Sequence, residues 1–322
     1  MLKGAKILVT GGAGFIASNL ILRLQKEKAL VRATIHDRSL QISPNGIEVV
    51  ETDLRDLSVC REVVNDVDYV FHCAANTSGA AVMAATPLVH VTPNVVMNTH
   101  LLEASYEAGV KKFIFISSGA AYPATGERPV EEQEMFDDDP EDIYFPVAWM
   151  KRYAEILCRT YATKIISPMS TLVVRPSNIY GPYDKFDFAT SHVTAALVRR
   201  VVERQDPMEI WGTGNDIRDL IFISDFIEGL LLAVHKCDFY DEINICSGLG
   251  VTIKEILQAA LRIEQCENAD IKFNSNKPST VHVRRLDDSK AKKRLRFEPK
   301  VGLDEGLTQV IAWYKENPFI VG

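Results

Sequence analysis

A short stretch near the N-terminus, Ile7 to Ser18 (ILVTGGAGFIAS), constrains the fold more than any other part of the chain. Its apolar start predicts a buried parallel strand that runs directly into a glycine turn and then into a helix beginning near Phe15. Gly12, Gly14 and Ala17 fit the spacing G-x-G-x-x-G/A, in which glycines allow a tight turn and a close approach of the backbone to a pyrophosphate. The helix N-terminus adds amide donors and the positive end of a dipole. This stretch therefore predicts the first unit of a dinucleotide-binding α/β sheet.

Composition narrows the class of protein. The chain has 322 residues, enough for one large domain or two modest domains that share an interface. Hydrophobic residues make up 47% and charged residues 25%, which excludes disordered and fibrous classes, and the net charge of −7 argues against a nucleic-acid binder. The six cysteines are scattered and none lies in a C-x-x-C motif, and the chain has no histidine pair in an H-E-x-x-H motif. We therefore expect reduced thiols and no metal site. No apolar run reaches membrane-spanning length, so we expect a cytoplasmic protein that does not contact membranes.

The first half of the chain alternates strand and helix signals in the order of a doubly wound (Rossmann) parallel α/β sheet. Further strands are predicted at 30–35, 47–52, 69–73, 112–116 and 172–175, and helices from Asn94 to Gly109 and from Pro146. After Asn178 the pattern breaks into shorter units, including helices near 192–204 and 224–235. We therefore expect a dinucleotide-binding domain of residues 1–178 with about 217–238, and a second, smaller substrate-binding domain of 179–216 and 239–322.

Several motifs in the first half carry a family resemblance. With Thr10 and Gly11 the glycine turn spells T-G-x-x-G-x-x-A, and here the chain resembles the extended short-chain dehydrogenase/reductase superfamily. His72-Cys73-Ala74-Ala75 resembles the H-x-A-A turn of that superfamily, and Asp53-Leu54 its adenine-contacting pair. The resemblance implies a dinucleotide cofactor. The residues expected to contact it are Gly11, Gly14, Phe15, Ile16, His36, Asp37, Arg38, Asp53, Leu54, Ala74, Ala75, Asn94, Lys151 and Pro176.

The end of the second predicted strand bears on the choice between NAD and NADP. In this fold an acid there selects the free 2′-hydroxyl of the adenosine ribose, and a cation selects a 2′-phosphate. The position where NAD-using relatives carry the acid is Ile35, whereas Asp37 could still serve NAD and His36 or Arg38 could serve NADP. We therefore expect NAD or NADP, with a slight preference for NADP.

By resemblance, catalysis in this superfamily uses a serine or threonine, a tyrosine and a lysine, the last two spaced Y-x-x-x-K. Ser118 matches the serine that holds the substrate oxygen, and Lys151 matches the lysine that binds the nicotinamide ribose. Val147 occupies the place of the tyrosine, and a valine cannot transfer a proton. Tyr144 is the nearest phenol, but Pro146 suits the first turn of the helix, so we expect Tyr144 in the entering loop. Tyr144 is therefore either a replacement proton carrier or an aromatic packing residue.

The second half narrows the resemblance to nucleotide-sugar enzymes of the GDP-fucose synthase type. The matching segments are Asn178-Ile179-Tyr180-Gly181-Pro182, Ser191-His192-Val193, Trp211-Gly212-Thr213-Gly214, Arg218-Asp219 and Arg284-Arg285-Leu286-Asp287. By resemblance His192 is an epimerisation base, although Ala120 replaces the cysteine that works with it. The expected substrate-binding residues are Asn178, His192, Trp211, Arg218, Arg284 and Arg285, since guanidinium groups suit a diphosphate and tryptophan can stack on a base.

These observations predict an enzyme that exchanges hydride between NAD(P) and C4 of a nucleoside-diphosphate sugar, with epimerisation at C3 or C5 as a further step. The catalytic residues would be Ser118, Lys151 and either His192 or Tyr144. Two alternatives stay open: a dehydratase or 4-epimerase that keeps its NAD, and a binding protein that has lost catalysis with its tyrosine. By resemblance the helices from Asn94 and Pro146 would form a homodimer interface.

Overall fold

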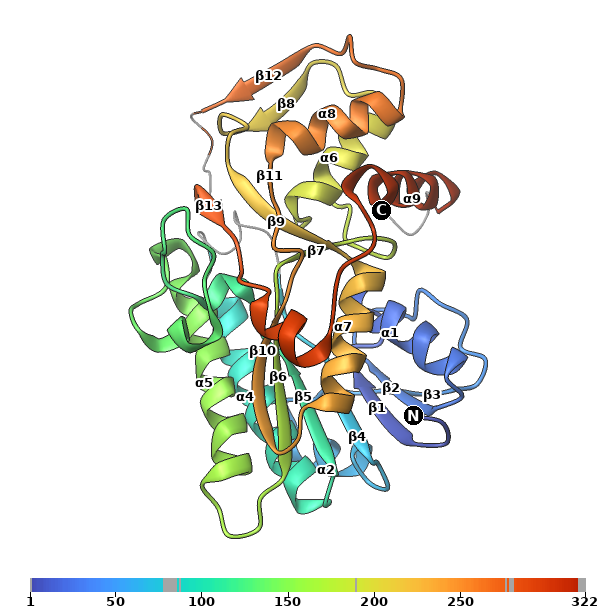
Figure 1. Ribbon diagram of the computed structural model, residues 1–322. Coiled ribbons are helices and arrows are strands. Elements are labelled where there is room, and N and C mark those ends of the chain that lie inside the picture. Colours follow the sequence, from blue (N-terminus) through green and yellow to red (C-terminus); the bar gives the residue numbers. More distant parts are fainter. Residues whose placement is uncertain are drawn as a thin grey trace.

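The computed structural model describes residues 2–77, 86, 88–188, 190–275, 277 and 281–317 (Figure 1). Its centre is a seven-stranded sheet of order β10-β6-β5-β4-β1-β2-β3 in which all neighbours are parallel. The strands are β1 Lys6–Thr10, β2 Leu30–Ile35, β3 Ile47–Glu51, β4 Tyr69–His72, β5 Lys112–Ile116, β6 Ser170–Pro176 and β10 Tyr240–Ile245. The predicted doubly wound α/β sheet is confirmed. Ligands in such sheets bind at the carboxyl ends of the strands, where the order reverses between β1 and β4.

Helices cover both faces of this sheet. They are α1 Phe15–Lys26, α2 Leu57–Val63, α4 Leu88–Glu107, α5 Phe145–Thr163 and α7 Ile223–Lys236. Ile7 and Val9 of β1 share a hydrophobic core with α1 and α7, whereas Leu8 between them packs with α2, α4 and α5. Because successive side chains of a strand point to opposite faces, a continuous apolar run such as Ile7 to Val9 fits a strand covered on both sides.

Helix α4 corrects one prediction, because it begins at Leu88 and not at Asn94. The sequence suggested a start after Pro93, since proline lacks the amide hydrogen that would bond the carbonyl of Val89 four residues earlier. In the structure Asn76 supplies the missing donor: its side-chain Nδ2 lies 3.0 Å from the Val89 oxygen. A side chain from the loop after β4 thus allows the helix to continue through its proline.

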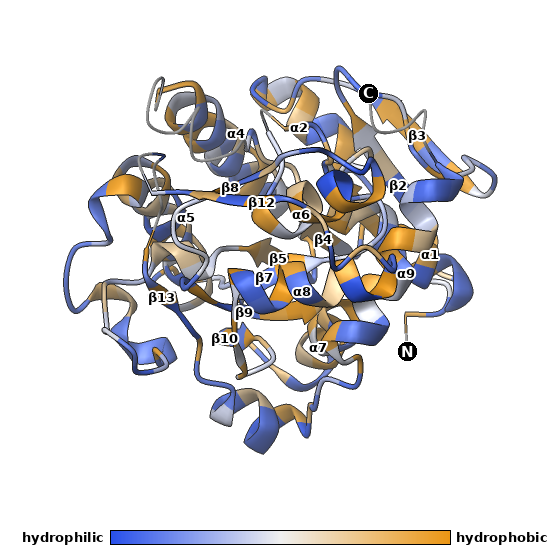
Figure 2. Ribbon diagram, turned by 90° about the horizontal axis from the view of Figure 1, so that it is seen from above, coloured by the Kyte–Doolittle hydropathy of each residue, from blue (hydrophilic) through white to orange (hydrophobic). Residues whose placement is uncertain are grey.

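The second domain is built around short strands and two amphipathic helices. Its elements are β7 Asn178–Tyr180, α6 Val193–Val202, β8 Met208–Trp211, β9 Ile217–Phe222, β11 Gly250–Thr252, α8 Ile253–Ile263, β12 Ile271–Asn274, β13 Val283–Arg284 and α9 Leu303–Glu316. Strand β9 pairs with β7, β11 and β13, and β8 pairs with β12. Helix α8 buries one apolar side that includes Ile256, Leu257 and Ala260, and its other side is hydrophilic (Figure 2).

The predicted division of the chain needs two changes. The sequence placed about 217–238 in the dinucleotide-binding domain, but β9 lies in the sheet of the second domain. The sequence assigned everything from residue 239 to the second domain, but β10 pairs with β6 over its whole length as the outermost strand of the central sheet. The strand was hard to recognise in the sequence because it contains two charged residues, Asp241 and Glu242. In the structure, ion pairs with Lys290 and Arg294 balance the charge of Asp241. None of the described helices is long and apolar enough to cross a membrane.

Candidate active site

The glycine turn between β1 and α1 packs closely against the turn that follows β4. Gly11 has a φ of +67°, and a Cβ atom on it would lie 2.7 Å from the Cα of Ala74. The turn is therefore restricted to glycine, and it packs directly on the H-x-A-A turn. Gly14 has no side chain with which to cap α1, so the first amide groups of the helix, around Phe15 and Ile16, stay available to an anion such as a pyrophosphate. The residues present fit a dinucleotide at this edge.

A buried hydrogen-bonded chain fixes the two turns to each other. The Thr10 hydroxyl donates to Nδ1 of His72 at 2.8 Å and accepts from the backbone amides of Cys73 and Ala74 at 3.1 and 3.0 Å. Nε2 of His72 donates to Oδ1 of Asn98 at 2.8 Å. Burial lowers the pKa of His72 to about 4, so the ring is neutral at pH 7. Asn98 was not predicted from the sequence, because it lies mid-helix and only the fold brings it to His72.

This buried histidine predicts a specific acid sensitivity. The unfolded chain protonates His72 below about pH 6.5, whereas the folded protein does so only near pH 4. The unfolded state therefore binds more protons in this interval, and the free energy of unfolding should fall by up to about 3 kcal/mol as the pH drops from 6.5 to 4. Urea unfolding across this range should show a flatter pH dependence for His72→Gln. Equal slopes for both proteins would contradict the assignment.

The edge beyond β2 and β3 carries the residues predicted to contact the adenosine. Asp53 accepts hydrogen bonds from Arg55, at 2.9 Å from Nε and 2.5 Å from Nη2, and this interaction lowers the pKa of Asp53 to about 2. Nδ1 of His36 lies 2.9 Å from the carboxylate of Asp37. Leu54 is buried beneath this edge and Arg38 is exposed on it. Each acid at this edge already has a cationic or potentially cationic partner.

Asn94 lies at the base of the loop after β4. Its Oδ1 accepts from the backbone amide of Asn76 at 2.8 Å, and its Nδ2 donates to the carbonyl oxygens of Asn76 and His90 at 2.9 and 2.5 Å. Both ends of the Asn94 amide thus bind protein backbone. The residue holds the loop that follows Ala75, and any effect on a dinucleotide passes through that loop.

Ser118 and Lys151 both lie at the carboxyl end of β5. Nζ of Lys151 donates to the carbonyl oxygen of Ile116 at 2.8 Å and lies 4.8 Å from the centre of the Phe115 ring. Burial lowers the pKa of Lys151 to about 8, although the charge of Glu155 opposes this shift. Two residues beyond Ile116, the half-buried Ser118 accepts a hydrogen bond from the amide of Ala120 at 3.1 Å. The fold therefore brings together the two residues that the family pattern predicted.

Tyr144 caps the N-terminus of α5, three residues before Val147. It lies seven residues before Lys151, which is close to two helical turns, so the two residues lie on nearly the same side of the helix. Its half-buried ring packs against a small core that includes Tyr122 and Ala148. The phenol also acts electrostatically on Arg218 and Arg284, which come from strands far along the chain.

Arg218 and Arg284 are two buried guanidinium groups on the adjacent strands β9 and β13. Burial lowers the pKa of both, and Tyr144 opposes the shift in each case. Nη1 of Arg284 donates two long hydrogen bonds, to the carbonyl oxygens of Tyr122 and Pro123. Its Nε and Nη2 are buried without a protein partner. Burying a cation whose hydrogen-bond donors have no acceptor costs free energy, unless an anion binds there and accepts those hydrogen bonds. The pair forms a candidate site for a diphosphate.

The remaining predicted residues do not all join this pair. Arg285 follows Arg284, and its Nη2 donates instead to the carbonyl of Gly248 at 3.1 Å. Trp211 is 43% exposed at the end of β8, with the ammonium of Lys277 5.6 Å from its ring centre. Pro176 is the last residue of β6, the strand next to β5, and Asn178 begins β7 two residues later.

His192 is exposed and caps α6, one position before the predicted first turn. It acts electrostatically on the buried Asp184, whose pKa burial raises to about 6. The neighbouring Lys185 lies in the segment Asp184-Lys185-Phe186-Asp187, which also resembles the family but was given no role from the sequence. Its Nζ donates to the carbonyl of Thr77 at 2.7 Å in the loop after β4. Likewise, Asn19 of α1 donates to the carbonyl of Pro182 at 2.9 Å. The segment after β7 is therefore attached to the dinucleotide-binding edge on both sides of the glycine turn.

Comparisons with known proteins agree with this geometry. The sequence profile of the NAD dependent epimerase/dehydratase family matches residues 7–246. GDP-mannose 3,5-epimerase 1 of Oryza sativa subsp. indica is 30% identical, covering 97% of this chain and 82% of that protein. GDP-L-fucose synthase 1 of Arabidopsis thaliana is 28% identical, covering 98% of this chain and 94% of that protein. The structure of UDP-glucose 4-epimerase from Thermotoga maritima with UDP-glucose matches with a TM-score of 0.87 at 28% identity, covering 97% of this chain and 99% of that one. This chain belongs to the NAD dependent epimerase/dehydratase family.

Proposed function

We propose that this enzyme oxidises, reduces or epimerises the sugar of a nucleoside-diphosphate sugar at C4, with C3 and C5 as further positions, and that the nucleotide is GDP. The observation that carries the proposal is Arg284, a buried cation whose Nε and Nη2 have no protein partner, on the strand beside a second buried cation, Arg218, and near Tyr144. Similarity to GDP-mannose 3,5-epimerase and GDP-L-fucose synthase over nearly the whole chain supports a GDP-linked substrate.

The residues divide the work as follows. Arg218 and Arg284 bind the diphosphate through planar, charge-assisted hydrogen bonds. Ser118 donates a hydrogen bond to the sugar oxygen, and Lys151 binds the nicotinamide ribose. When bound, the dinucleotide supplies a hydride acceptor or donor for the sugar carbon. Tyr144 moves the proton of the sugar hydroxyl, since a transient negative charge on its oxygen would be offset by the two guanidinium groups.

The cofactor proposed is NADP, with NAD as the alternative. Strand β2 ends at Ile35 without an acid, and Asp37 and Asp53 already pair with His36 and Arg55. Arg38 lies close enough to Lys185 to act on it electrostatically, so cationic groups gather at this edge. Such an edge favours a 2′-phosphate over a free hydroxyl. NADPH should therefore bind more tightly than NADH in a fluorescence titration.

The test starts from the purified protein. Nucleotide released by denaturation is identified by mass, and the protein is then incubated in D₂O with GDP-mannose, and separately with NADPH and a GDP-4-keto-6-deoxy sugar. Mass gained by the sugar at C3 or C5 supports epimerisation, and NADPH consumption supports reduction. Stoichiometric bound NAD with inversion at C4 and no deuterium gained by the sugar, or loss of water from the sugar, would replace the proposal by a 4-epimerase or a dehydratase. Dinucleotide binding without turnover of any sugar nucleotide would leave a binding protein.

Tyr144→Phe tests the proton carrier. We expect kcat to fall about 100-fold or more, because the phenol proton is lost while the ring still packs against Tyr122 and Ala148. Dinucleotide affinity should stay unchanged. Adding Val147→Tyr to this variant places a phenol four residues before Lys151 and should restore part of the turnover. If Tyr144→Phe retains full activity, Tyr144 is an aromatic packing residue and His192→Gln becomes the variant to measure.

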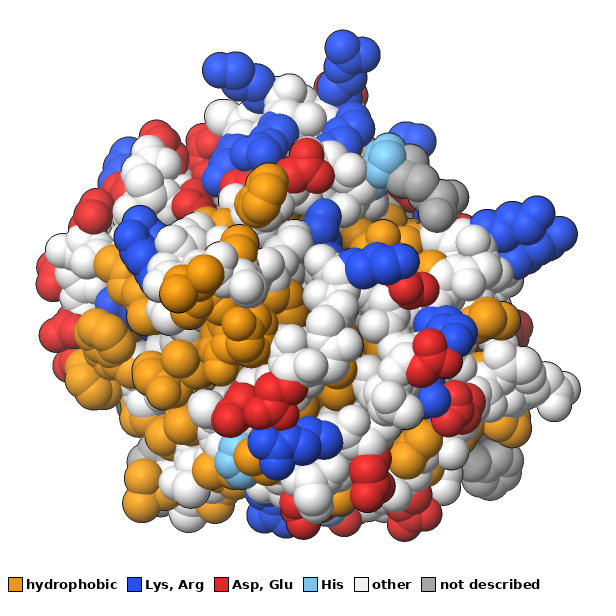
Figure 3. All heavy atoms as spheres, turned by 90° about the horizontal axis from the view of Figure 1, so that it is seen from below, with side chains coloured by type: hydrophobic (Ala, Val, Ile, Leu, Met, Phe, Trp, Pro, Cys, Tyr) orange, Lys and Arg blue, Asp and Glu red, His pale blue; other side chains and the backbone are white. Residues whose placement is uncertain are grey.

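We further propose that the enzyme is a homodimer that pairs through α4 and α5. Apolar side chains gather over one side of the molecule (Figure 3), the side on which α5 lies in Figure 1. Those of α4 and α5 that are exposed are Leu88, Val89, Phe145, Trp149, Tyr153 and Ile156. A continuous apolar face of this kind on a soluble enzyme indicates a protein interface. The family resemblance implies a four-helix contact here.

The variant Trp149→Glu/Tyr153→Glu should be monomeric at micromolar concentration, because two charges would be buried without partners in the contact. Analytical ultracentrifugation measures this directly. Ile166→Glu is the matched control, since Ile166 is an exposed apolar residue outside these helices. A monomeric wild-type protein, or an unchanged sedimentation coefficient in the double variant, would reject the interface.

A further inference from the structure

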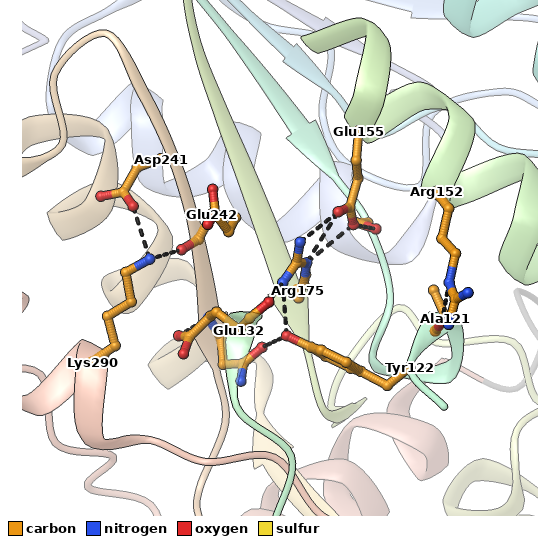
Figure 4. Close-up of polar contacts among 11 residues, drawn as sticks. Ala121, Tyr122, Glu132, Arg152, Glu155, Arg175, Asp241, Glu242 and Lys290 are labelled. Atoms are coloured by element: carbon orange, nitrogen blue, oxygen red, sulfur yellow. Dashed lines mark hydrogen bonds and ion pairs between the residues drawn. The ribbon is translucent and has the colours of Figure 1, made fainter. Parts of the chain in front are cut away.

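A buried polar cluster lies next to the Lys151 and Ser118 site and has no role in the chemistry described above (Figure 4). Its centre is the ion pair of Glu155 on α5 with Arg175 on β6, whose side chains are 0% and 2% exposed. Nη2 and Nε of Arg175 lie 2.6 and 3.2 Å from Oε2 of Glu155. Burying two charges costs nearly as much as their attraction returns, so stability alone does not explain the pair.

Glu155 and Lys151 hold successive residues of the same strand end. Lys151 donates to the carbonyl of Ile116, and the Ser117 hydroxyl donates to Oε1 of Glu155. The next residue is Ser118. Because Glu155 follows Lys151 by one helical turn, α5 is attached to the end of β5 at two adjacent points.

Arg175 holds the other side of Ser118. Its Nη1 donates to the phenol oxygen of Tyr122 at 2.9 Å and to the carbonyl of Glu132 at 2.7 Å. The Tyr122 hydroxyl in turn donates to Oδ1 of Asn244 at 2.7 Å. Ser118 therefore lies between Ser117, which Glu155 holds, and Tyr122, which Arg175 holds.

We propose that Glu155, held by Arg175, is a positioning residue that fixes Lys151 and Ser118 relative to each other and keeps the Lys151 amine charged. The inference rests on the role of Lys151 in dinucleotide binding given under the proposed function.

Three titratable groups face Lys151. Glu155 lies on the same helix, and His72 and Cys73 lie at the end of β4. His72, with a pKa of about 4, is neutral at pH 7, and burial raises the pKa of the Cys73 thiol to about 12. Glu155 is therefore the one of the three that supplies negative charge to Lys151 near neutral pH. Without it, the pKa of Lys151 would fall further below its value of about 8.

The test measures the affinity for NADH by fluorescence from pH 6.5 to 10. The wild-type affinity should weaken with a midpoint near pH 8, as Lys151 loses its proton. In Glu155→Gln the midpoint should fall by about one pH unit. Glu155→Asp keeps the charge and should keep the midpoint nearer to that of the wild type. Thermal unfolding of each variant reports changes in stability separately.

Two further variants separate positioning from folding. Glu155→Leu/Arg175→Met replaces the whole pair by apolar side chains, which should preserve stability but still lower the midpoint. Asp241→Asn is the matched control, since Asp241 is a buried carboxylate on β10 with the cationic partners Lys290 and Arg294, outside the contacts of Lys151. It should change stability without moving the midpoint.

The outcomes are distinguishable. A wild-type midpoint in both Glu155→Gln and the double variant, whatever their stability, would overturn the positioning role and leave the proposed function intact. Lys151→Met should bind NADH more weakly and without a midpoint near pH 8. If instead it binds with the wild-type pH dependence, the role of Lys151 fails, and the inference that rests on it fails as well.

Discussion

Replacement of Lys151 by methionine should lower kcat about 100-fold or more and at the same time stabilise the folded protein at pH 7. Activity falls because the amine can no longer bind the ribose beside Ser118. Stability rises because burial lowers the pKa of Lys151 to about 8, so the fold must hold a charge that the unfolded chain solvates freely. The difference of about 2.5 pKa units corresponds to about 3 kcal/mol at most, and we expect a gain of about 1–3 kcal/mol.

The pH dependence of this gain identifies its cause. The unfolded lysine keeps its proton up to about pH 10.5, whereas the folded one loses it near pH 8. Between these values the unfolded state binds more protons, so the wild-type free energy of unfolding should rise with pH. The advantage of Lys151→Met should therefore shrink from pH 8 to pH 10.5. Urea unfolding at pH 7, 9 and 10.5 measures this, and a gain that is constant over the range would point to packing alone.

Replacement of Arg284 by methionine should weaken binding of the sugar nucleotide by about 30- to 1,000-fold, or 2–4 kcal/mol. The reason is the arrangement of this side chain: its Nε and Nη2 are buried without partners, and it lies beside a second buried cation, Arg218. A diphosphate would accept hydrogen bonds from these Arg284 donors and would be attracted by the charges of both guanidinium groups. The same arrangement is unfavourable without ligand, so Arg284→Met should also unfold at a higher temperature than the free wild type.

Isothermal titration with GDP measures this effect without any assumption about the reaction. Lys293→Met is the matched control, because it removes one positive charge from an exposed position. Its affinity for GDP should equal that of the wild type, and the affinity of Arg284→Met for NADPH should also be unchanged. A normal GDP affinity in Arg284→Met would show that the diphosphate binds elsewhere.

Much of the central sheet could be predicted from local patterns. The run of apolar residues from Ile7, the glycine turn and the helix after it occupy the predicted positions, and strands β2 and β5 have the predicted bounds. Such patterns can be recognised in a sequence because a strand covered on both faces needs a continuous apolar run and a tight turn needs glycine. Strand β10 was not predicted, because its two acidic residues interrupt the apolar run that marks a buried strand. The cations that balance Asp241 lie about 50 residues later in the chain.

Part of the candidate site could likewise be predicted from the sequence, and part could not. Ser118, Lys151 and the arginines were predicted from their resemblance to family motifs. The structure has Lys151 bonded to the carbonyl of Ile116, two residues before Ser118, and Arg284 paired with Arg218. Spacing could not distinguish Arg284 from Arg285, because which of two neighbouring side chains turns toward Tyr122 depends on the pairing of β13 with β9.

The sequence by itself determined where the strands of the first half lie along the chain, the glycine turn that suits a dinucleotide, and the absence of a tyrosine four residues before Lys151. Only the tertiary structure decided which phenol lies near the guanidinium groups, which arginine pairs with Glu155, and which amide continues α4 through Pro93. The physical reason is distance along the chain. Local periodicity and turn chemistry involve residues a few positions apart. The partners of buried charges and of carbonyls without a helical hydrogen bond are instead side chains that packing brings close from other parts of the chain.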